Sequence, residues 1–309
     1  RLRFIFYAYA MTYPFSFPFL FLLGLAAGSF LNVVASRYKP GNRLFDLKVI
    51  NGRSFCPECK KQLSWYELAP VLSFLWQRGR CRHCGDRISF QYPLVEIISG
   101  LIAVAVPAVL FGVYDVAYLS AIGENIGWFY VFSAIWILVF WTCLLLSLID
   151  FRHFIIPDQI NVFIAGLGAL FTAGQWYFGK FNFLNGSFLG SYSLMFGLRD
   201  NVWLNHLAAA LLAALFFGAI IYLSRGKGMG IGDLKLGAAL GLLIGWPDIA
   251  LALMLAFIVG AVFSVVLMIL RKKGMKDYLP FGPFIVAGTA LVFLGGYEIV
   301  RFYFTLFKL

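Results

Sequence analysis

The chain is dominated by long, continuous runs of apolar residues rather than by alternating apolar and polar positions. Most runs are about 20 residues long, the length that a helix needs to cross roughly 30 Å of hydrocarbon. We expect eight such helices, with ends defined to within several residues. They cover residues 15–37, 93–113, 128–150, 155–178, 202–224, 233–247, 248–270 and 283–306. The predicted fold is therefore an all-α polytopic membrane protein with about eight transmembrane helices.

The apolar pattern breaks sharply only once. Residues 38–92 contain ten Lys or Arg, four Asp or Glu and four of the five cysteines. We interpret this stretch as a soluble insertion between the first two helices. Residues 1–37 then form an N-terminal segment with the first helix, and residues 93–309 form the polytopic core.

Composition supports the membrane assignment for the whole chain. Hydrophobic residues make up 61% and charged residues 13%, against roughly 25% charged in an ordinary soluble domain. A mean hydropathy of +0.85 excludes a soluble enzyme with a single anchor. The net charge of +11 would suggest nucleic-acid binding in a soluble protein, but most basic residues here lie between apolar runs.

The basic residues predict the orientation, because Lys and Arg accumulate in short cytoplasmic loops. With the insertion in the cytoplasm, the loops on its side hold Arg152, His153, Arg225, Lys227, Lys235, Arg271, Lys272, Lys273 and Lys276. The opposite loops hold Asp115, Glu124, Lys180, Arg199, Asp200 and Asp248. Both termini then face outward. A seven-helix alternative joins the runs around Gly245–Asp248, but it moves the last basic cluster to the outer side.

Four cysteines in the insertion are typical of a metal site. Cys56 and Cys59 form one Cys-x-x-Cys pair, and Cys81 and Cys84 form a second pair 21 residues later. Four thiolates close a tetrahedral shell, which predicts structural rather than catalytic zinc. Two disulfides or free thiols are the alternatives, although a reducing cytoplasm disfavours the disulfides. A further alternative is that His83 replaces one sulfur.

The insertion also carries Arg78, Arg80, Arg82 and Arg87, which would suit a nucleic-acid-binding zinc ribbon. The same arginines satisfy the positive-inside rule and can face lipid phosphate. We therefore expect membrane lipid, and no nucleic acid, as a partner.

Two aspartates mark a candidate catalytic site. Asp150 closes the third predicted helix and Asp233 opens the sixth. Placing an ionisable group within or at the edge of a membrane helix costs free energy, so each such group is a candidate functional residue. By the predicted topology, both lie at cytoplasmic helix ends and at similar depth, where they can meet.

A shared site makes these two carboxyl groups an acid and a base, because two like charges cannot both form easily there. One member can activate water for attack on a carbonyl while the other donates a proton to the carbonyl oxygen. This is the chemistry of an intramembrane aspartyl protease. Gly230 and Gly232 leave room for a substrate backbone beside Asp233 and allow a hinge.

Three further charged residues are candidate substrate-binding or supporting residues. Asp158 begins the fourth helix, where the helix dipole alone explains a carboxylate. Lys235 is either a cytoplasmic anchor or a charge that biases the aspartate pair. Glu96 likewise fits a helix start and is a candidate contact for a cationic substrate or cofactor.

A series of ordered motifs extends over nearly the whole chain. These are Gly28-Ser29-Phe30-Leu31-Asn32-Val33-Val34, the two cysteine pairs, Arg78-Gly79-Arg80-Cys81, Tyr92-Pro93-Leu94-Val95-Glu96, Ile149-Asp150, Ile156-Pro157-Asp158, Gly228-Met229-Gly230-Ile231-Gly232-Asp233-Leu234-Lys235 and Pro280-Phe281-Gly282-Pro283-Phe284. In these motifs the chain resembles the type IV prepilin leader peptidases. A long stretch between Pro40 and Cys56 and a roomy outer loop at residues 179–201 depart from the usual pattern.

The resemblance implies that Asp150 and Asp233 are the catalytic pair of a bacterial inner-membrane enzyme. Its substrates would be type IV prepilins and type II secretion pseudopilins, whose short basic leaders are cut after Gly on the cytoplasmic side. Cysteine-bearing members commonly also methylate the new N-terminal amine with S-adenosylmethionine. No Gly-rich dinucleotide fingerprint is present, so the methyl-donor pocket must come from the insertion and nearby helix ends, with Glu96 as a candidate.

A transporter or channel is the rival interpretation from a different class. In it, Asp150 and Asp233 relay protons or bind cations. That interpretation predicts ion flux in liposomes.

Overall fold

The computed structural model describes residues 16–41, 44, 52–181, 186–196, 201–271 and 278–307. In chain order its elements are α2 (Ser16–Arg37), η1 (Trp65–Glu67), α4 (Leu72–Trp76), α5 (Gln91–Val113), α6 (Val116–Ala121), α7 (Gly127–His153), α8 (Asp158–Tyr177), η2 (Gly190–Phe196), α9 (Val202–Leu223), α10 (Ile231–Ile244), α11 (Asp248–Ile269) and α12 (Gly282–Phe307). Among the described residues, β structure is limited to two isolated bridges, between Phe55 and Gln62 and between Arg80 and Arg87. The predicted all-α polytopic fold is confirmed.

Each of the eight predicted ranges contains one long helix, and six of these helices are long and apolar enough to cross a membrane. The six are α2, α5, α7, α9, α11 and α12. The helix α10 has 14 residues, or about 21 Å, which is short of the roughly 30 Å hydrocarbon core. The helix α8 is long enough but carries buried Asn161 and Gln175, which lower its hydropathy. The helix α10 packs against α8 and α9, whereas α8 keeps an exposed face that includes Val162 and Leu170.

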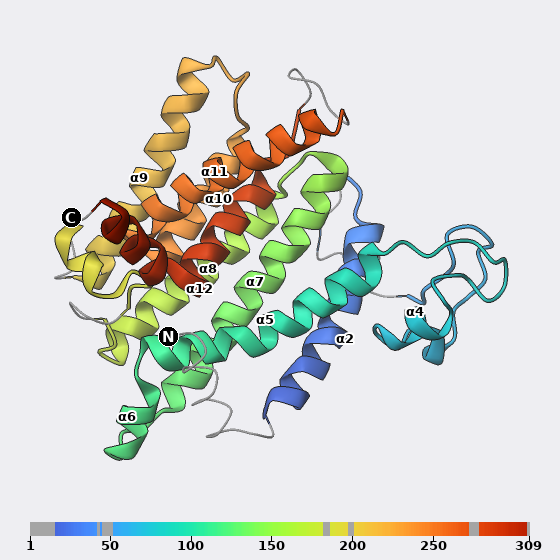
Figure 1. The fold of residues 1–309 in the computed structure, drawn as a ribbon, viewed down its shortest axis with the longest axis horizontal. Helices are drawn as coiled ribbons and strands as arrows, with labels where there is room; N and C mark the ends of the chain where they lie inside the picture. Colours follow the sequence, from blue (N-terminus) through green and yellow to red (C-terminus); the bar gives the residue numbers. More distant parts are fainter. Residues whose placement is uncertain are drawn as a thin grey trace.

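Helices α2 and α5 approach each other closely through small residues (Figure 1). A Cβ atom at Gly24 would lie 2.6 Å from Cα of Gly100, and one at Gly28 would lie 2.7 Å from Cα of Glu96. Only glycine permits this separation, as in other membrane helix pairs joined by small residues four apart. The helix α5 also packs on α7, so the first two long helices are fixed to the polytopic core.

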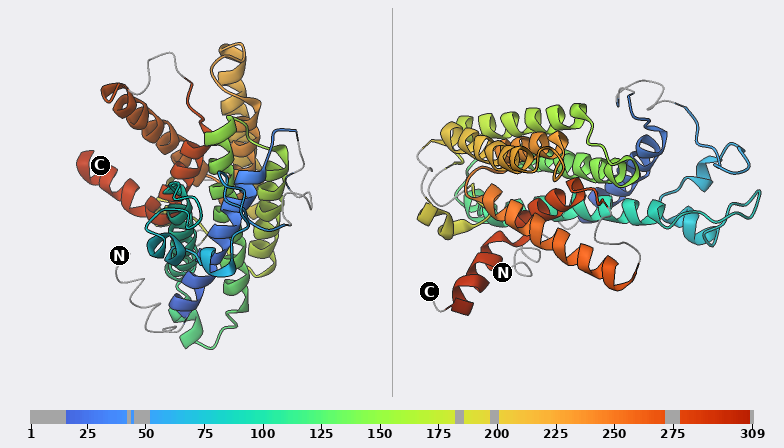
Figure 2. Two further views of the ribbon diagram at one scale, coloured as in Figure 1. Left: turned by 90° about the vertical axis from the view of Figure 1, so that its right-hand side faces the viewer. Right: turned by 90° about the horizontal axis from the view of Figure 1, so that it is seen from above.

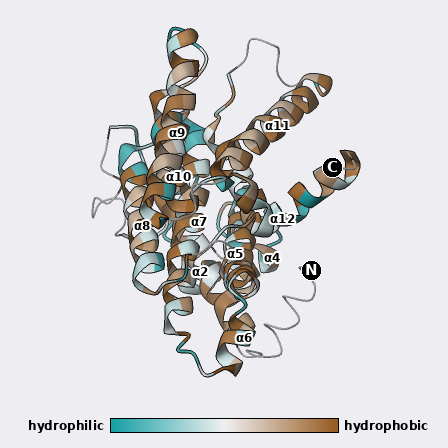
Figure 3. Cartoon of the chain, turned by 90° about the vertical axis from the view of Figure 1, so that its left-hand side faces the viewer, coloured by the Kyte–Doolittle hydropathy of each residue, from teal (hydrophilic) through white to brown (hydrophobic). Residues whose placement is uncertain are grey.

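Aromatic side chains fill the centre of the bundle. Trp136 of α7 is fully buried, and its ring centroid lies 4.6 Å from that of Phe293 and 5.6 Å from that of Phe171. These rings join α7, α12 and α8. By contrast, α9 and α11 expose apolar side chains outward, which is the surface expected to face lipid (Figure 3).

The insertion projects from one end of the bundle (Figures 1 and 2). It begins beside the end of α7, where the ring centroids of Tyr38 and His153 are 6.0 Å apart. The buried Leu44 donates its backbone N–H to Oε1 of Gln159, at the start of α8, over 2.5 Å. The chain after α2 therefore folds back onto the end of the bundle that holds Asp150.

Part of the predicted charge pattern falls outside the described residues. This applies to Arg199, Asp200, Lys272, Lys273 and Lys276.

Candidate active site and metal centre

Asp150 lies one turn before the end of α7, and only 4% of its surface is exposed. Its Oδ2 atom accepts a hydrogen bond from the backbone N–H of Gly282 over 3.1 Å. Gly282 begins α12, so Asp150 faces the positive end of a second helix. A carboxylate buried at this position is stabilised by the backbone N–H and the dipole of α12.

Asp233 occupies the first turn of α10 and is 9% exposed. Its Oδ2 atom accepts from the backbone N–H of Gly230 over 3.1 Å, so the carboxylate caps its own helix. The backbone N–H of Asp233 donates to the Gly230 carbonyl in turn. The turn before α10 thus fixes the direction of the Asp233 side chain.

The fold brings these two aspartates together, as the sequence predicts. Their carboxyl groups lie close enough to interact electrostatically. Ile156, in the turn between α7 and α8, packs beside Gly232 and Gly282, the glycines next to the two aspartates: a Cβ at Gly232 would lie 3.1 Å from its Cβ, and a Cβ at Gly282 would lie 3.1 Å from its Cδ1. Two buried carboxyl groups with backbone donors form an arrangement that can exchange protons with water and a carbonyl group.

Gly282 is the residue of this site to which sequence reasoning gave no role. A Cβ atom there would lie 2.6 Å from Oδ2 of Asp150. The sequence does mark this position, because the Pro280–Phe284 motif places Pro and Gly at a helix start. The contact itself joins residues 132 positions apart, so no local pattern could identify its partner.

Lys235 and Asp158 pair with each other at the edge of the site. The Nζ atom of Lys235 lies 2.7 Å from Oδ1 of Asp158, with side chains 45% and 66% exposed. This ion pair connects the first turns of α10 and α8. The lysine near Asp233 thus has a carboxylate partner outside the aspartate pair.

Glu96 connects the insertion to the bundle. It is buried in the second turn of α5, and its Oε2 atom accepts from the backbone N–H of Val71 over 2.7 Å. The side chain of Ser29, on α2, also hydrogen-bonds to it. Val71 is the residue before α4, so Glu96 holds the start of that short helix.

The four cysteines of the insertion converge. Their Sγ atoms all lie within 4.8 Å of one another, and Sγ of Cys56 is 3.9 Å from Sγ of Cys84. Sulfurs that surround zinc tetrahedrally at about 2.3 Å are about 3.8 Å apart, so this donor set fits zinc. His83 faces elsewhere, with Nε2 3.5 Å from the buried carboxylate of Glu67. All four thiols are free of disulfides.

The two cysteine pairs have matching backbone geometry. In each turn, the residue after the second cysteine, Lys60 or Gly85, has positive φ and donates its N–H to the carbonyl of the first cysteine. A single β-bridge closes each turn. Amide hydrogen bonds from Cys84 and His83 lower the pKa of the Cys81 thiol to about 7. Two such turns present four sulfurs to one point, and a metal ion there would stabilise a region with little apolar core.

Comparison with known proteins places the chain in a family. Residues 22–110 match the Bacterial Peptidase A24 N-terminal domain, and residues 137–265 match the Type IV leader peptidase family. A prepilin leader peptidase/N-methyltransferase from Aeromonas hydrophila is 32% identical, covering 94% of each chain. The chain belongs to the type IV leader peptidase family. Relatives with the same name from Bacillus subtilis and Pseudomonas aeruginosa are 31% and 28% identical, over 92% and 96% of this chain and 96% of each relative.

The matched regions of the chain contain the two candidate sites. The N-terminal match contains the cysteine cluster and Glu96, whereas the second match contains Asp150 and Asp233. Gly282 lies beyond the second match. No solved structure matches the chain.

Proposed function

We propose that this protein is a prepilin leader peptidase that uses Asp150 and Asp233 as its catalytic pair. The observation that carries the proposal is the meeting of two buried carboxyl groups from α7 and α10, each held by a glycine N–H. The names of the relatives support the same reaction. A transmembrane substrate helix would bring its scissile bond to this depth.

The reaction follows from one proton shared between the two carboxyl groups. The unprotonated member takes a proton from water as the water oxygen bonds to the scissile carbonyl carbon. The protonated member gives its proton to the carbonyl oxygen. The carbon–nitrogen bond then breaks, the departing amine takes the proton first removed from water, and the carbonyl reforms as its hydroxyl proton returns to the other carboxyl.

The substrates we propose are type IV prepilins and type II secretion pseudopilins, with short basic leaders cut after Gly. The enzyme lies in the bacterial inner membrane, with the aspartates and the insertion on the cytoplasmic side. Basic leaders suit this location, because the two aspartates are acidic and the cytoplasmic entrance is wet. The packing of Tyr38 and Leu44 against the α7 and α8 ends agrees with a common side for both sites.

We also propose that the enzyme methylates the new N-terminal amine with S-adenosylmethionine, as the names of its relatives suggest. The four cysteines hold zinc in a structural role, since all four ligand positions are protein sulfurs. Zinc at this position keeps the insertion folded; it takes no part in the hydrolysis.

The proposal is tested with the purified protein in detergent, a prepilin and S-adenosylmethionine, followed by gels and mass spectrometry. The wild-type protein is expected to release the leader after Gly and to add one methyl group. Asp150→Asn and Asp233→Asn should each lower cleavage by at least about 100-fold while the protein remains folded. Asp158→Asn is the matched control, because Asp158 is an exposed carboxylate near the same helix ends. Full cleavage by either Asn variant of the pair contradicts the mechanism.

A further inference from the structure

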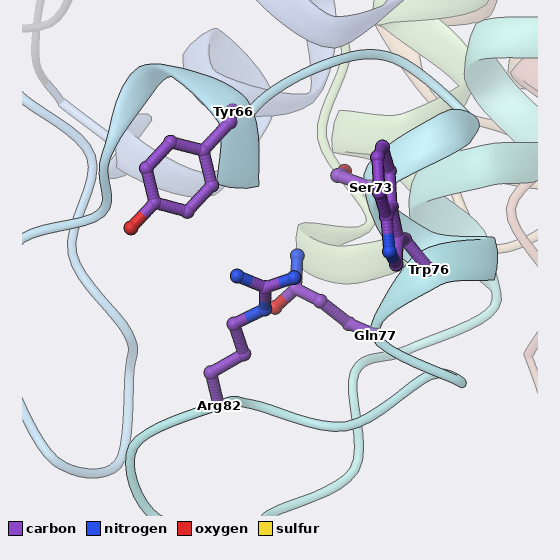
Figure 4. Close-up of a pocket in the computed structure, with 5 residues that line it drawn as sticks. All are labelled: Tyr66, Ser73, Trp76, Gln77 and Arg82. Carbon is purple, nitrogen blue, oxygen red and sulfur yellow. The ribbon is translucent and has the colours of Figure 1, made fainter.

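A cavity of about 310 Å³ lies within the insertion, apart from the aspartates and the cysteine cluster. The side chains of Tyr66, Ser73, Trp76, Gln77 and Arg82 line it (Figure 4). Three short segments meet there: η1 supplies Tyr66, α4 and the residue after it supply the next three, and the second cysteine turn supplies Arg82. None of these residues has a role in the hydrolysis.

The walls of this cavity combine two aromatic faces with one positive charge. The guanidinium carbon of Arg82 lies 5.5 Å from the ring centroid of Tyr66, and no carboxylate is among the lining residues. Trp76 is 80% exposed and Tyr66 is 48% exposed, so neither ring serves as core. Open aromatic faces beside a guanidinium suit a ligand that has a flat heteroaromatic ring and an anionic group.

We propose that this cavity is the binding site for S-adenosylmethionine, an inference that rests on the proposed N-methyltransferase activity. The ligand carries a purine that can stack on an aromatic ring, a sulfonium that is attracted to a π face, and a carboxylate that pairs with Arg82. Gln77 and Ser73 offer hydrogen-bonding groups for the purine and the ribose. The volume lies at the lower end of the usual range for small-molecule sites, about 300–1,000 Å³.

Once bound, the donor supplies a methyl carbon to an unprotonated amine: the C–N bond forms, the S–CH₃ bond breaks with its electrons kept by sulfur, and one proton passes to water. The five lining residues bind and orient the methyl donor. They include no carboxylate or imidazole that could remove the proton.

Two features outside the cavity position its walls. Arg82 lies between Cys81 and Cys84, so the cysteine cluster fixes the segment that carries it. Glu96 holds the start of α4, which carries Ser73 and Trp76. The cavity therefore depends on both the metal site and the bundle, and it lies at the end of the molecule where Asp150 would release a new N-terminus.

The test measures binding of S-adenosylhomocysteine to the full-length protein in detergent by calorimetry. Trp76→Ala and Arg82→Gln should each weaken binding at least tenfold and reduce methylation, while prepilin cleavage stays at the wild-type rate. Trp65→Ala and Arg87→Gln are the matched controls, because they change an exposed tryptophan and an exposed arginine of the same insertion outside the cavity. The zinc content of each variant confirms that the insertion remains folded.

Wild-type affinity in both cavity variants overturns the proposal. If the wild-type protein cleaves prepilin but neither binds the probe nor methylates, the cavity assignment fails while the peptidase stands. Binding that depends on Trp76 and Arg82 in a protein without cleavage supports the cavity and contradicts the proposed peptidase.

Discussion

At the scale of single residues, both candidate catalytic carboxylates depend on glycine. Gly282 and Gly230 donate backbone N–H groups to Asp150 and Asp233, so no neighbouring cationic side chain is needed to hold them. A backbone donor at a helix start is already oriented and carries part of the helix dipole. The absence of a Cβ at Gly282 is equally important for the position of Asp150, because the Oδ2 atom of Asp150 lies where that Cβ would be in contact.

Gly282→Ala should reduce cleavage by about 100-fold. The added Cβ would lie 2.6 Å from Oδ2 of Asp150, so the carboxylate would have to move away from its present position. Steady-state kinetics on a prepilin substrate measure this effect. Gly166→Ala, in α8, is the control: its Cβ would meet no atom within 4 Å, so the variant should be as active as wild type and equally or more stable. Normal activity of Gly282→Ala would show that Asp150 does not need this position.

Lys235→Ala should change the free energy of unfolding by no more than about 1 kcal/mol, because its ion pair with Asp158 is substantially exposed. Cleavage should stay within a few-fold of wild type. Thermal unfolding and cleavage assays of Lys235→Ala, Asp158→Asn and the double variant check both points. A large loss of cleavage activity in Lys235→Ala but not in Asp158→Asn would contradict the expected small effect. It would mean that Lys235 acts on the aspartate pair.

At the scale of elements, apolar length predicted the position of all eight long helices, and the cysteine spacing predicted the cluster. The depth match of Asp150 and Asp233 followed from helix ends alone. Contacts between distant segments could not be predicted in this way: Glu96 with Val71, and Leu44 with Gln159, depend on how the insertion folds back. The predicted range 233–247 covers most of α10 but ends three residues too late, because flanking apolar residues continue the hydrophobic run beyond Ile244.

Cys84→Ser should lower bound zinc well below one equivalent and unfold the insertion, because a thiolate is lost from the four-sulfur set. Metal analysis and protease sensitivity of residues 52–90 measure these effects. Cys143→Ala is the control, since this cysteine is buried in α7 away from the cluster. Zinc release should also become easier as pH falls, since protons compete for the thiolates. Less than half an equivalent of zinc in the wild-type protein would contradict the assignment.

Glu96→Ala should loosen the start of α4, because the Val71 N–H loses its acceptor in a partly buried position. We expect faster hydrogen exchange in residues 71–77 and reduced methylation, with cleavage reduced less. Glu96→Gln keeps an acceptor oxygen and should restore most of the protection. Unchanged exchange in Glu96→Ala would show that the hydrogen bond does not hold α4.

At the scale of the whole molecule, the bundle gives the enzyme two working regions at one end. The helices α7, α10 and α12 form the carboxylate site, and the insertion between α2 and α5 carries the cysteines and the aromatic cavity (Figure 2). Close packing of α2 on α5 fixes the insertion to the rest. Under the proposed mechanism, a substrate cut at the aspartates therefore reaches the second region without crossing the membrane.

The proposed orientation predicts how the cysteines react from each side of the membrane. Cys59 and Cys84 are exposed on the insertion and Cys143 is buried. A membrane-impermeant maleimide should leave intact cells unlabelled and should label inverted vesicles once a chelator has removed the metal. Cys59→Ser/Cys84→Ser protein should lose most of that labelling. Labelling of these cysteines in intact cells would contradict the proposed orientation and place the insertion on the outer side.

The backbone origin of the donors to Asp150 and Asp233 has a consequence for inhibition. A compound that contacts only the two carboxyl groups and the peptide N–H groups of Gly230 and Gly282 would touch no exchangeable side chain. Single substitutions that weaken such a compound would also disturb the support of the reacting groups. If the proposed mechanism holds, resistance to such a compound would arise at the access route or in the expression level, because substitutions at Gly230, Gly282 or the aspartates would also lower activity.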